Sequence, residues 1–288
     1  MSFKGLEMNR ILIILIFVFT SQACDYKRDS IGGNDDIVVL AAKEDREKIG
    51  SLLSIVFNDT LLTPSPELFY NIKFAEPESF SALKTQTNLV IASIGDYEQI
   101  NDYLVQNSTF IKQQFDENFF KKQAQYFLEN VRQEELESEI YSSYDWTMKI
   151  PWGWELIRND SVKSFFWIGQ ELPFRWIAVN WRDGNHFSKE DALEYLQEFP
   201  QEHFSSIRYN QDYLNIEFDD FNNESAYRVF GLWESIDDAK GGPFQGYIFY
   251  DYENDRTFYI SYIVFNPGGK KAFYMRQMEM IAKTIDIN

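Results

Sequence analysis

The first half of the chain alternates between two hydrophobic patterns. Short apolar runs typical of strands occupy residues 37–42, 68–74 and 89–94. Between and after them, the spacing of apolar residues predicts helices at 43–57, 79–84 and 97–105. Because strand and helix alternate, we predict a small α/β domain over residues 37–108.

A longer helical pattern follows this domain. One face stays apolar from about residue 109 to residue 144, through Ile111, Phe115, Phe119, Ala124, Phe127, Val131, Leu136 and Ile140. The opposite face is rich in glutamate between Glu129 and Glu139 and has no His or Asp at the spacing of metal ligands. This pattern is typical of a solvated helix face. We predict one helix at 109–144 that connects two domains.

The second half is dominated by strand patterns. Apolar runs bounded by turn residues lie at 146–150, 154–157, 164–168, 176–180, 213–218, 227–233, 245–252 and 257–265. Two helices are expected, at 189–199 and 271–285. Short turns between consecutive strands favour antiparallel pairing. We therefore predict an α+β fold class: an N-terminal α/β layer, the connecting helix, and a mostly antiparallel sheet with flanking helices over residues 145–288.

The amino terminus carries an export signal. Lys4 and Arg10 precede the apolar run Ile11–Phe19, and small residues follow before Cys24. This run is too short to span a bilayer, which needs about 20 residues, so it predicts a signal peptide over residues 1–23. The polar, glycine-rich residues 24–36 predict a tether to the folded part.

The position of Cys24 resembles that of the cysteine in bacterial lipoprotein signal peptides. Ala23 fits the lipobox, whereas Ser21 stands where Leu is usual. The resemblance implies cleavage before Cys24, acylation of this residue, and attachment to the membrane through its acyl chains. Two or more acyl chains anchor a protein stably to a membrane. The charges between Asp25 and Asp29 cancel, so we expect the protein to face the periplasm, from the outer membrane.

Composition narrows the possible partners. The chain has 27 Lys and Arg against 45 Asp and Glu, a formal net charge of −18, which disfavours nucleic-acid binding. Removal of residues 1–23 leaves 25 basic and 44 acidic residues, so the exported part has no basic excess to attract anionic lipid. One cysteine allows no internal disulfide and no multi-cysteine metal site. Aromatic residues make up 17% of the chain, which indicates a folded protein with an aromatic core.

Several motifs resemble a family catalogued only as a domain of unknown function in Bacteroidota lipoproteins. They are Gly231-Leu232-Trp233-Glu234, Gly241-Gly242-Pro243-Phe244, Phe166-Trp167-Ile168, Asn266-Pro267, Ile37-Val38-Val39 and Asn88-Leu89-Val90. The resemblance is strongest between Gly231 and Ile285. Because the family has no established activity, it implies kinship and cellular address but no catalytic residues.

The chemically suggestive residues have simple structural interpretations. His186 and His203 lie on either side of a predicted helix without a second ligand or a nucleophile motif. Asp251, Glu253 and Asp255 have the spacing of a calcium loop, but Arg256 replaces the required glycine, so a hairpin turn is favoured. Gly241-Gly242-Pro243 lacks a following Lys and predicts a tight strand connection. We expect no metal and no cofactor.

Tryptophan and glycosylation patterns supply the remaining candidates. Most of the seven tryptophans are expected in the core, but Trp152, Trp154 and Trp181 lie beside turns or on one strand face and could form a binding surface for a protein or a glycan. Three short triplets resemble the Asp-Ser/Thr-apolar acceptor of Bacteroidota periplasmic O-glycosylation, which makes Ser30, Thr60 and Ser161 candidate sites.

These observations favour a lipid-anchored cell-envelope protein that acts as a non-catalytic binding or assembly module. One alternative is a hydrolase of cell-wall or glycan substrates that uses acidic residues between Asp219 and Glu224. The other is a carrier of a lipid or small ligand, which would require an apolar cavity between sheet and helices.

Overall fold

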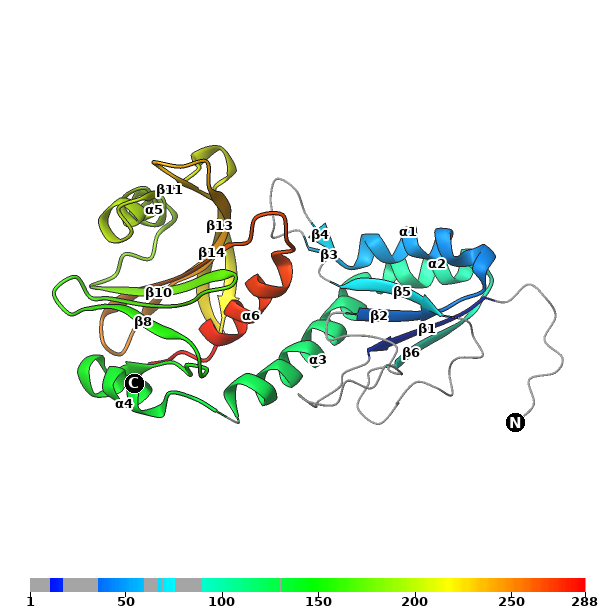
Figure 1. Ribbon diagram of the computed structural model, residues 1–288, viewed down its shortest axis with the longest axis horizontal. Coiled ribbons are helices and arrows are strands. Elements are labelled where there is room, and N and C mark those ends of the chain that lie inside the picture. Colours follow the sequence, from blue (N-terminus) through cyan, green and yellow to red (C-terminus); the bar gives the residue numbers. More distant parts are fainter. Residues whose placement is uncertain are drawn as a thin grey trace. The chain divides into compact units, whose positions relative to one another are not determined.

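The computed structural model describes residues 11–17, 36–59, 67–68, 70–75, 90–129 and 131–287. The chain divides into two compact units (Figure 1). Unit 1 comprises Met1–Asp59 and Leu68–Gln123, and unit 2 comprises Thr60–Glu67 and Ala124–Asn288. Helices and a large antiparallel sheet occur together, which confirms the α+β class.

Unit 1 contains a four-stranded sheet in the order β5-β2-β1-β6. Its strands are β1 (Ile11–Phe17), β2 (Asp36–Leu40), β5 (Asn71–Ala75) and β6 (Val90–Gly95). β2 and β5 pair in parallel, whereas β1 is antiparallel to both β2 and β6. β2, β5 and β6 therefore run in one direction, as expected for an α/β layer.

Strand β1 lies within the predicted signal peptide. A short, continuous apolar run is typical both of a buried strand and of the apolar region of an export signal. In the full chain this segment occupies the position between β2 and β6. Cys24, the tether and the helix predicted at 79–84 lie outside the described residues.

Helices α1 (Arg46–Val56) and α2 (Tyr97–Gln106) pack against each other in unit 1. α2 begins with a capping box, in which Asp96 accepts from the Gln99 backbone and Gln99 accepts from the Asp96 backbone. Helix α3 (Ser108–Leu128) adds Phe115, which meets Phe57 edge-on with ring centres 5.3 Å apart. These aromatic contacts give unit 1 its own core.

The chain forms two helices where the pattern predicts one. After α3, Glu129 and residues 131–133 are not helical, and α4 covers Glu134–Tyr144. Here Gln133 Nε2 donates to the Pro151 carbonyl over 3.1 Å, and Glu137 Oε1 accepts from the Ile150 backbone over 2.7 Å. These tertiary hydrogen bonds tie α4 to the segment before the large sheet. These hydrogen bonds outweigh the tendency to form one continuous helix, which the apolar stripe through the break would favour.

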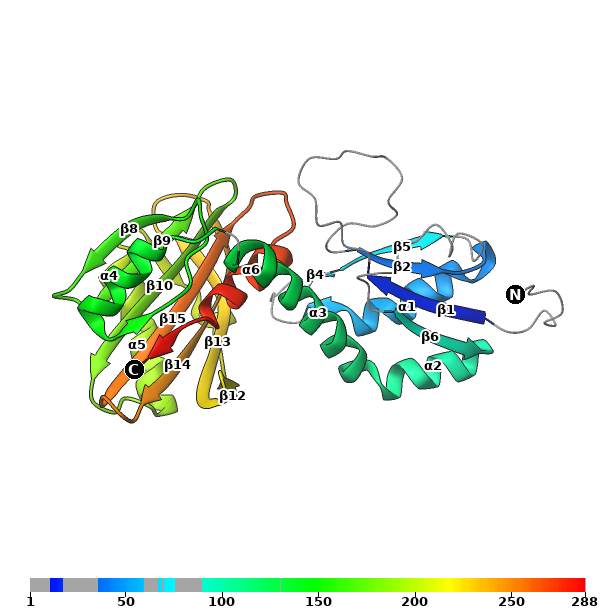
Figure 2. The same cartoon turned by 90° about the horizontal axis from the view of Figure 1, so that it is seen from below.

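Unit 2 is built on one large sheet, whose strands lie side by side in Figure 2. Its order is β11-β13-β14-β15-β10-β9-β8, and β12 also pairs with β13. All of these pairs are antiparallel, as predicted. The strands are β8 (Glu155–Asp160), β9 (Phe165–Gln170), β10 (Phe174–Asp183), β11 (Ile207–Tyr209), β12 (Asn215–Phe221), β13 (Glu224–Ser235), β14 (Gly241–Asp251) and β15 (Arg256–Phe265).

Helix α5 (Lys189–His203) packs on one face of the sheet, and α6 (Ala272–Ala282) contacts β15 and β10. The core under α5 includes Leu196, Phe199 and Tyr259. A second aromatic group surrounds Trp146, whose ring lies 5.7 Å from Phe166 and 5.5 Å from Trp181. Because successive strand residues point to opposite faces, the strands supply both cores and are hydrophobic nearly throughout.

The Gly241-Gly242-Pro243 segment is part of strand β14 and not a connection between strands. A Cβ atom on Gly242 would lie 2.2 Å from the Val264 carbonyl oxygen. The next residue but one, Phe244, stacks on Tyr209 at a centroid distance of 3.8 Å. The glycine is therefore needed for close approach of two backbones, while the phenylalanine fills the core.

Short strand pairs complete the fold. β3 (Asn58–Asp59) pairs with β4 (Glu67–Leu68), and β16 (Asp286–Ile287) pairs with β7 (Trp146–Thr147). Across the described residues, no helix has both the length and the apolar character required to cross a membrane.

Candidate functional site

The face of the sheet that carries α5 is the candidate functional surface of unit 2. α5 has 15 residues, so it is about 22 Å long and about 10 Å wide. Strands in a sheet are spaced by about 4.8 Å, so a helix of this width covers roughly two strand spacings. The seven strands of the main path are much wider than that, and part of this face stays uncovered.

The N-terminus of α5 is fixed by Ser188. Its hydroxyl accepts a hydrogen bond from the Asp191 backbone over 3.0 Å and donates one to the Asp191 carboxylate over 2.6 Å. Glu190 and Asp191 lie in the first turn, where the helix dipole stabilises negative charge. On the sheet-facing side, Tyr195 and Phe199 are buried.

A cavity of about 210 Å³ lies beside α5. Residues of α5, of strands β10, β14 and β15, and of the segment before α5 line it: Asn180, Arg182, His186, Asp191, Ala192, Glu194, Tyr195, Glu198, Ile248, Thr257, Phe258 and Tyr259. Its lining thus combines aromatic rings of the core with carboxylates of the helix.

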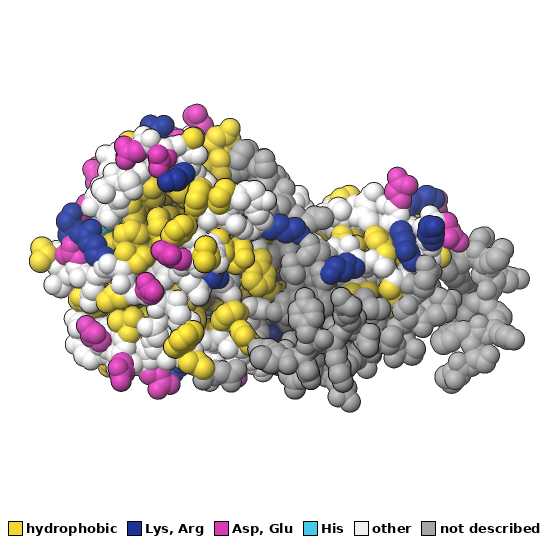
Figure 3. Space-filling view, in the orientation of Figure 1, with side chains coloured by type: hydrophobic (Ala, Val, Ile, Leu, Met, Phe, Trp, Pro, Cys, Tyr) yellow, Lys and Arg dark blue, Asp and Glu magenta, His cyan; other side chains and the backbone are white. Residues whose placement is uncertain are grey.

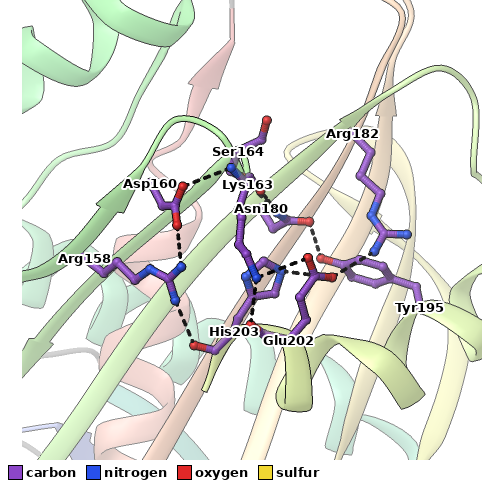
Figure 4. Close-up of polar contacts among 9 residues, drawn as sticks. All are labelled: Arg158, Asp160, Lys163, Ser164, Asn180, Arg182, Tyr195, Glu202 and His203. Atoms are coloured by element: carbon purple, nitrogen blue, oxygen red, sulfur yellow. Dashed lines mark hydrogen bonds and ion pairs between the residues drawn. The ribbon is translucent and has the colours of Figure 1, made fainter. Parts of the chain in front are cut away.

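The buried polar groups of the cavity are held by hydrogen bonds. The Tyr195 hydroxyl donates to Asn180 Oδ1, and Asn180 Nδ2 donates to the carbonyls of Lys163 and Ser164 over 3.0 and 2.9 Å. Burial raises the pKa of Tyr195 well above its ordinary value, so this hydroxyl stays protonated and remains a donor. Figure 4 shows these contacts, which link α5 to β10 and to the turn between β8 and β9.

Arg182 lies between the cavity and the C-terminal end of α5. Its guanidinium carbon is 4.2 Å from the centre of the Tyr195 ring, and its Nη2 atom is 3.7 Å from a Glu202 carboxylate oxygen. Glu202 also lies 3.8 Å from Lys163 Nζ. The charge of Arg182 is therefore already matched by a carboxylate of the protein (Figure 4).

His203 is a buried, uncharged member of the same neighbourhood. Its ring stacks on Phe165 at a centroid distance of 4.3 Å, and its Nδ1 atom has no hydrogen-bond partner within the described part of the chain. Burial lowers the pKa of His203 to about 4, although Glu202 opposes the shift. A side chain this deeply packed is a core group rather than a catalytic base.

Arg158 and Asp160 close this neighbourhood on strand β8. Arg158 donates to the Asp160 carboxylate and, over 3.4 Å, to the His203 carbonyl. The hydrogen bond from Arg158 lowers the pKa of Asp160, so this carboxyl stays ionised. Together these contacts position the sheet edge against the end of α5 (Figure 4).

Next to α5, the uncovered part of the sheet face carries an apolar surface that we call the aromatic face. It consists of Ile157, Trp167, Phe174, Trp176 and Phe265. Ile157 and Phe174 are 44% and 39% exposed, and the other three are half-buried against the core under α5. Figure 3 shows hydrophobic side chains gathered over unit 2 in the area between α5 and β8.

Contacts across the strands hold the aromatic face together. Trp167 meets Trp176 edge-on with ring centres 5.2 Å apart. A Cβ atom on Gly169 would lie 2.5 Å from Ile157 Cδ1 and 2.6 Å from Trp176 Cδ1, so the glycine lets these two side chains meet above it. Phe174 lies 6.4 Å from Trp176 between ring centres. The result is a preformed apolar surface.

The three tryptophans predicted as a binding surface have different environments. Trp152 is 73% exposed, but Trp154 and Trp181 are only 4% and 7% exposed. Gly153 adopts φ +84° and the Trp154 backbone donates to the Pro151 carbonyl, so the segment turns and the two indoles do not share a face. Trp181 packs on Trp146. Only Trp152 is therefore exposed, and Trp154 and Trp181 belong to the core.

The other residues singled out from the sequence lie in different parts of the chain. Ser161 is exposed in the turn between β8 and β9, while Ser30 and Thr60 lie outside the described residues. His186 Nε2 lies 3.0 Å from the Asp183 carbonyl. Asp219 belongs to β12, with one carboxylate oxygen 3.6 Å from Arg228 Nη1.

The calcium-like spacing after β14 is a hairpin turn, as predicted. Asp251 Oδ1 accepts from the backbones of Glu253 and Asn254, over 3.1 and 3.2 Å. Over the described ranges, no three His, Cys, Asp or Glu side chains are grouped so that they could hold a metal ion.

The chain matches one known protein family. The sequence profile of a family described as "Domain of unknown function (DUF4837)" matches residues 133–284. The chain belongs to this family. The match covers α4, the large sheet and α6, so the candidate surface lies within the DUF4837 domain. A search of curated proteins gives no match.

Solved structures share limited similarity with the DUF4837 chain. A Bacteroides thetaiotaomicron protein aligns with a TM-score of 0.34 and 13% identity, over 51% of this chain and 46% of its own. The chain thus spans less than half the length of that protein. The Saccharomyces cerevisiae Ran-binding protein Mog1p aligns with a TM-score of 0.36 and 11% identity, over 50% of this chain and 90% of its own. Structural similarity at this level gives no indication of the function of this chain.

Proposed function

We propose that this protein is a lipid-anchored component of the cell envelope that binds a protein partner through its aromatic face and performs no catalysis. The observation that carries the proposal is the exposure of Ile157 and Phe174 on a sheet face that α5 does not cover. Exposed apolar surfaces of this kind, rimmed by polar residues, mark interaction sites.

The chemistry of the aromatic face favours a protein over a glycan. Its most exposed members, Ile157 and Phe174, have no polar group, and the two indoles meet edge-on instead of presenting a flat stacking platform. In the adjoining turn, Leu172 is 89% exposed. An apolar side chain of a partner could bury these groups, whereas sugar hydroxyls would need hydrogen-bond partners.

A photo-crosslinking amino acid at position 174, in intact cells, tests the binding surface. We expect one adduct of defined mass at position 174 and none at position 252. Tyr252 is a suitable control because it is also aromatic and 72% exposed, but it lies in the turn after β14. Ile157→Asp should abolish the adduct at position 174. Absence of an adduct, or the same adduct at position 252, contradicts the proposal.

Attachment through Cys24 is tested separately. We expect the Cys24→Ala variant to leave the membrane fraction, because the exported part has 25 basic and 44 acidic residues and gains nothing from anionic lipid. Retention of this variant in the membrane fraction after a high-salt wash would refute acylation of Cys24 as the anchor.

A further inference from the structure

Strand β8 forms one edge of the large sheet. It comes last in the strand order, after β9, and among the described residues no further strand pairs with it (Figure 2). Within the same ranges, the β8 backbone makes no hydrogen bond to the backbone of any segment other than β9. In an antiparallel edge strand, every second residue directs its N–H and C=O away from the sheet. β8 therefore offers backbone donors and acceptors to another strand.

The middle of this edge strand is apolar. Proteins protect exposed edges with charged side chains, with bulges or with a covering segment. The pairing register of β8 shifts between Leu156 and Arg158, so Ile157 sits in a bulge with no opposite residue on β9. This bulge directs Ile157 over Gly169 and onto the aromatic face. Leu156 and Ile157 are 42% and 44% exposed, so the bulge leaves apolar side chains at the edge.

β8 presents side chains to both faces of the sheet. Residues directly opposite each other on paired strands share a face. Arg158 lies opposite Trp167, a member of the aromatic face, whereas Asn159 lies opposite Phe166, whose ring packs on Trp146. A partner helix that rests on the aromatic face would be near only the first of these two faces. A strand added to β8 would lie beside both.

Charge near β8 indicates the chemistry of the partner. Glu155 of β8 and Glu171, in the turn after β9, are exposed and have neither a hydrogen-bond nor an ion-pair partner for their carboxylates in the described part of the chain. Arg158, in contrast, donates to Asp160. The unpaired charge of β8 and of this turn is therefore negative. A segment that carries Lys or Arg would complement it, whereas a second copy of this chain, with its net charge of −18, would be repelled.

From this geometry, we propose that the protein partner supplies an extended segment that pairs with β8 and adds a strand to the sheet. The inference rests on the proposed function as a protein-binding module and states how the partner is held. Backbone hydrogen bonds to β8 provide affinity, and side chains at alternate positions of the segment provide specificity. An apolar side chain of the segment contacts Ile157, and a Lys or Arg lies near Glu155.

A photo-crosslinking amino acid at position 155 or position 159 of the full chain, in intact cells, distinguishes an added strand from a helix. Glu155 and Asn159 are both exposed, and the β9 residues opposite them are Gly169 and Phe166. At about 3.3 Å per residue, the two positions are about 10 Å apart. We expect both to capture one partner, at residues about three or four apart in its sequence. A helix rises about 1.5 Å per residue and would give residues about seven apart.

Two controls accompany this measurement. Phe218 is 67% exposed on β12, an edge strand at the other side of the sheet, and a probe at its position should capture no partner. Glu155→Lys, combined with the probe at position 159, should lower the adduct yield about fivefold, because attraction to a basic segment becomes repulsion. Glu253→Lys makes the same change of charge in the turn after β14 and should leave the yield within about twofold.

The outcomes separate the added strand from the proposed function. An adduct at position 174 with none at position 159, or with captured residues about seven apart, would overturn strand addition and leave binding through the aromatic face in place. Capture of a second copy of this chain would overturn the choice of partner, and equal effects of Glu155→Lys and Glu253→Lys would overturn its basic character. Strand-spaced adducts at 155 and 159 without one at 174 would support the added strand and contradict only the aromatic face. No adduct at any of the three positions would contradict both.

Discussion

At the scale of single residues, burial decides the protonation of His203. Its pKa is lowered to about 4 by burial, against opposition from Glu202 and with smaller contributions from Lys163, Arg158 and Arg182. In the unfolded chain its pKa returns to about 6.5. As pH falls from 6.5 toward 4, the unfolded state therefore binds a proton that the folded state does not, and stability is lost.

Between pH 6.5 and pH 4, we expect protonation of His203 in the unfolded chain to lower the free energy of unfolding by about 2 kcal/mol. His203→Phe retains a ring against Phe165 and has no titrating group. Urea unfolding at several pH values checks this, followed by tryptophan fluorescence, which reports unit 2 because all seven tryptophans lie between Trp146 and Trp233. The variant should lose less stability toward pH 4 than the unmodified chain. Parallel curves would exclude His203 as the cause.

The burial of individual side chains could not be predicted from the sequence in every case. Trp154 and Trp181 lie beside turns, yet both are buried, because neighbouring strands and helices decide on which side a turn projects its residues. Ile157 and Phe174 were not distinguishable from other strand residues in the sequence. Their exposure depends on the width of the sheet relative to α5, which no local pattern records.

At the scale of elements, the hairpin between β12 and β13 has a two-residue loop. Asn222 and Asn223 have φ of 54° and 68°, the left-handed values required by a type I′ turn. We expect Asn223→Gly to preserve or slightly raise thermal stability. Asn223→Val should lower it by about 1–2 kcal/mol, because a β-branched residue is disfavoured there. Thermal unfolding of both variants, monitored by tryptophan fluorescence, checks the difference. Equal midpoints would contradict the turn assignment.

Elements with strong patterns were predictable, and those governed by distant contacts were not. The alternating and apolar runs of β9, β10 and β15 predicted their positions within a few residues. The break between α3 and α4 was missed because its cause is the pairing of Gln133 and Glu137 with the backbone near Pro151. Short β11, at Ile207–Tyr209, has too few residues to give a pattern.

At the scale of the whole molecule, the segment Ile11–Phe17 is both a strand of unit 1 and part of the signal peptide that the sequence predicts. As β1 it separates β2 from β6, and both neighbours run antiparallel to it. They are therefore parallel to each other. If residues 1–23 are removed on export, β2 and β6 can close the gap and pair directly, with α1 and α2 still packed together. The mature sheet would then consist of parallel strands, as the α/β pattern of residues 37–108 predicts.

Hydrogen exchange on a chain that begins at Asp25 tests this rearrangement. We expect the amides of Ile37–Leu40 and Val90–Ile94 to remain protected, because a parallel β2–β6 ladder replaces the hydrogen bonds formerly made to β1. The full chain is the comparison, and the protection of unit 2 serves as the internal control in both. Loss of protection confined to β2 and β6 would mean that unit 1 needs Ile11–Phe17 as a strand. That result would count against removal of this segment as a signal peptide.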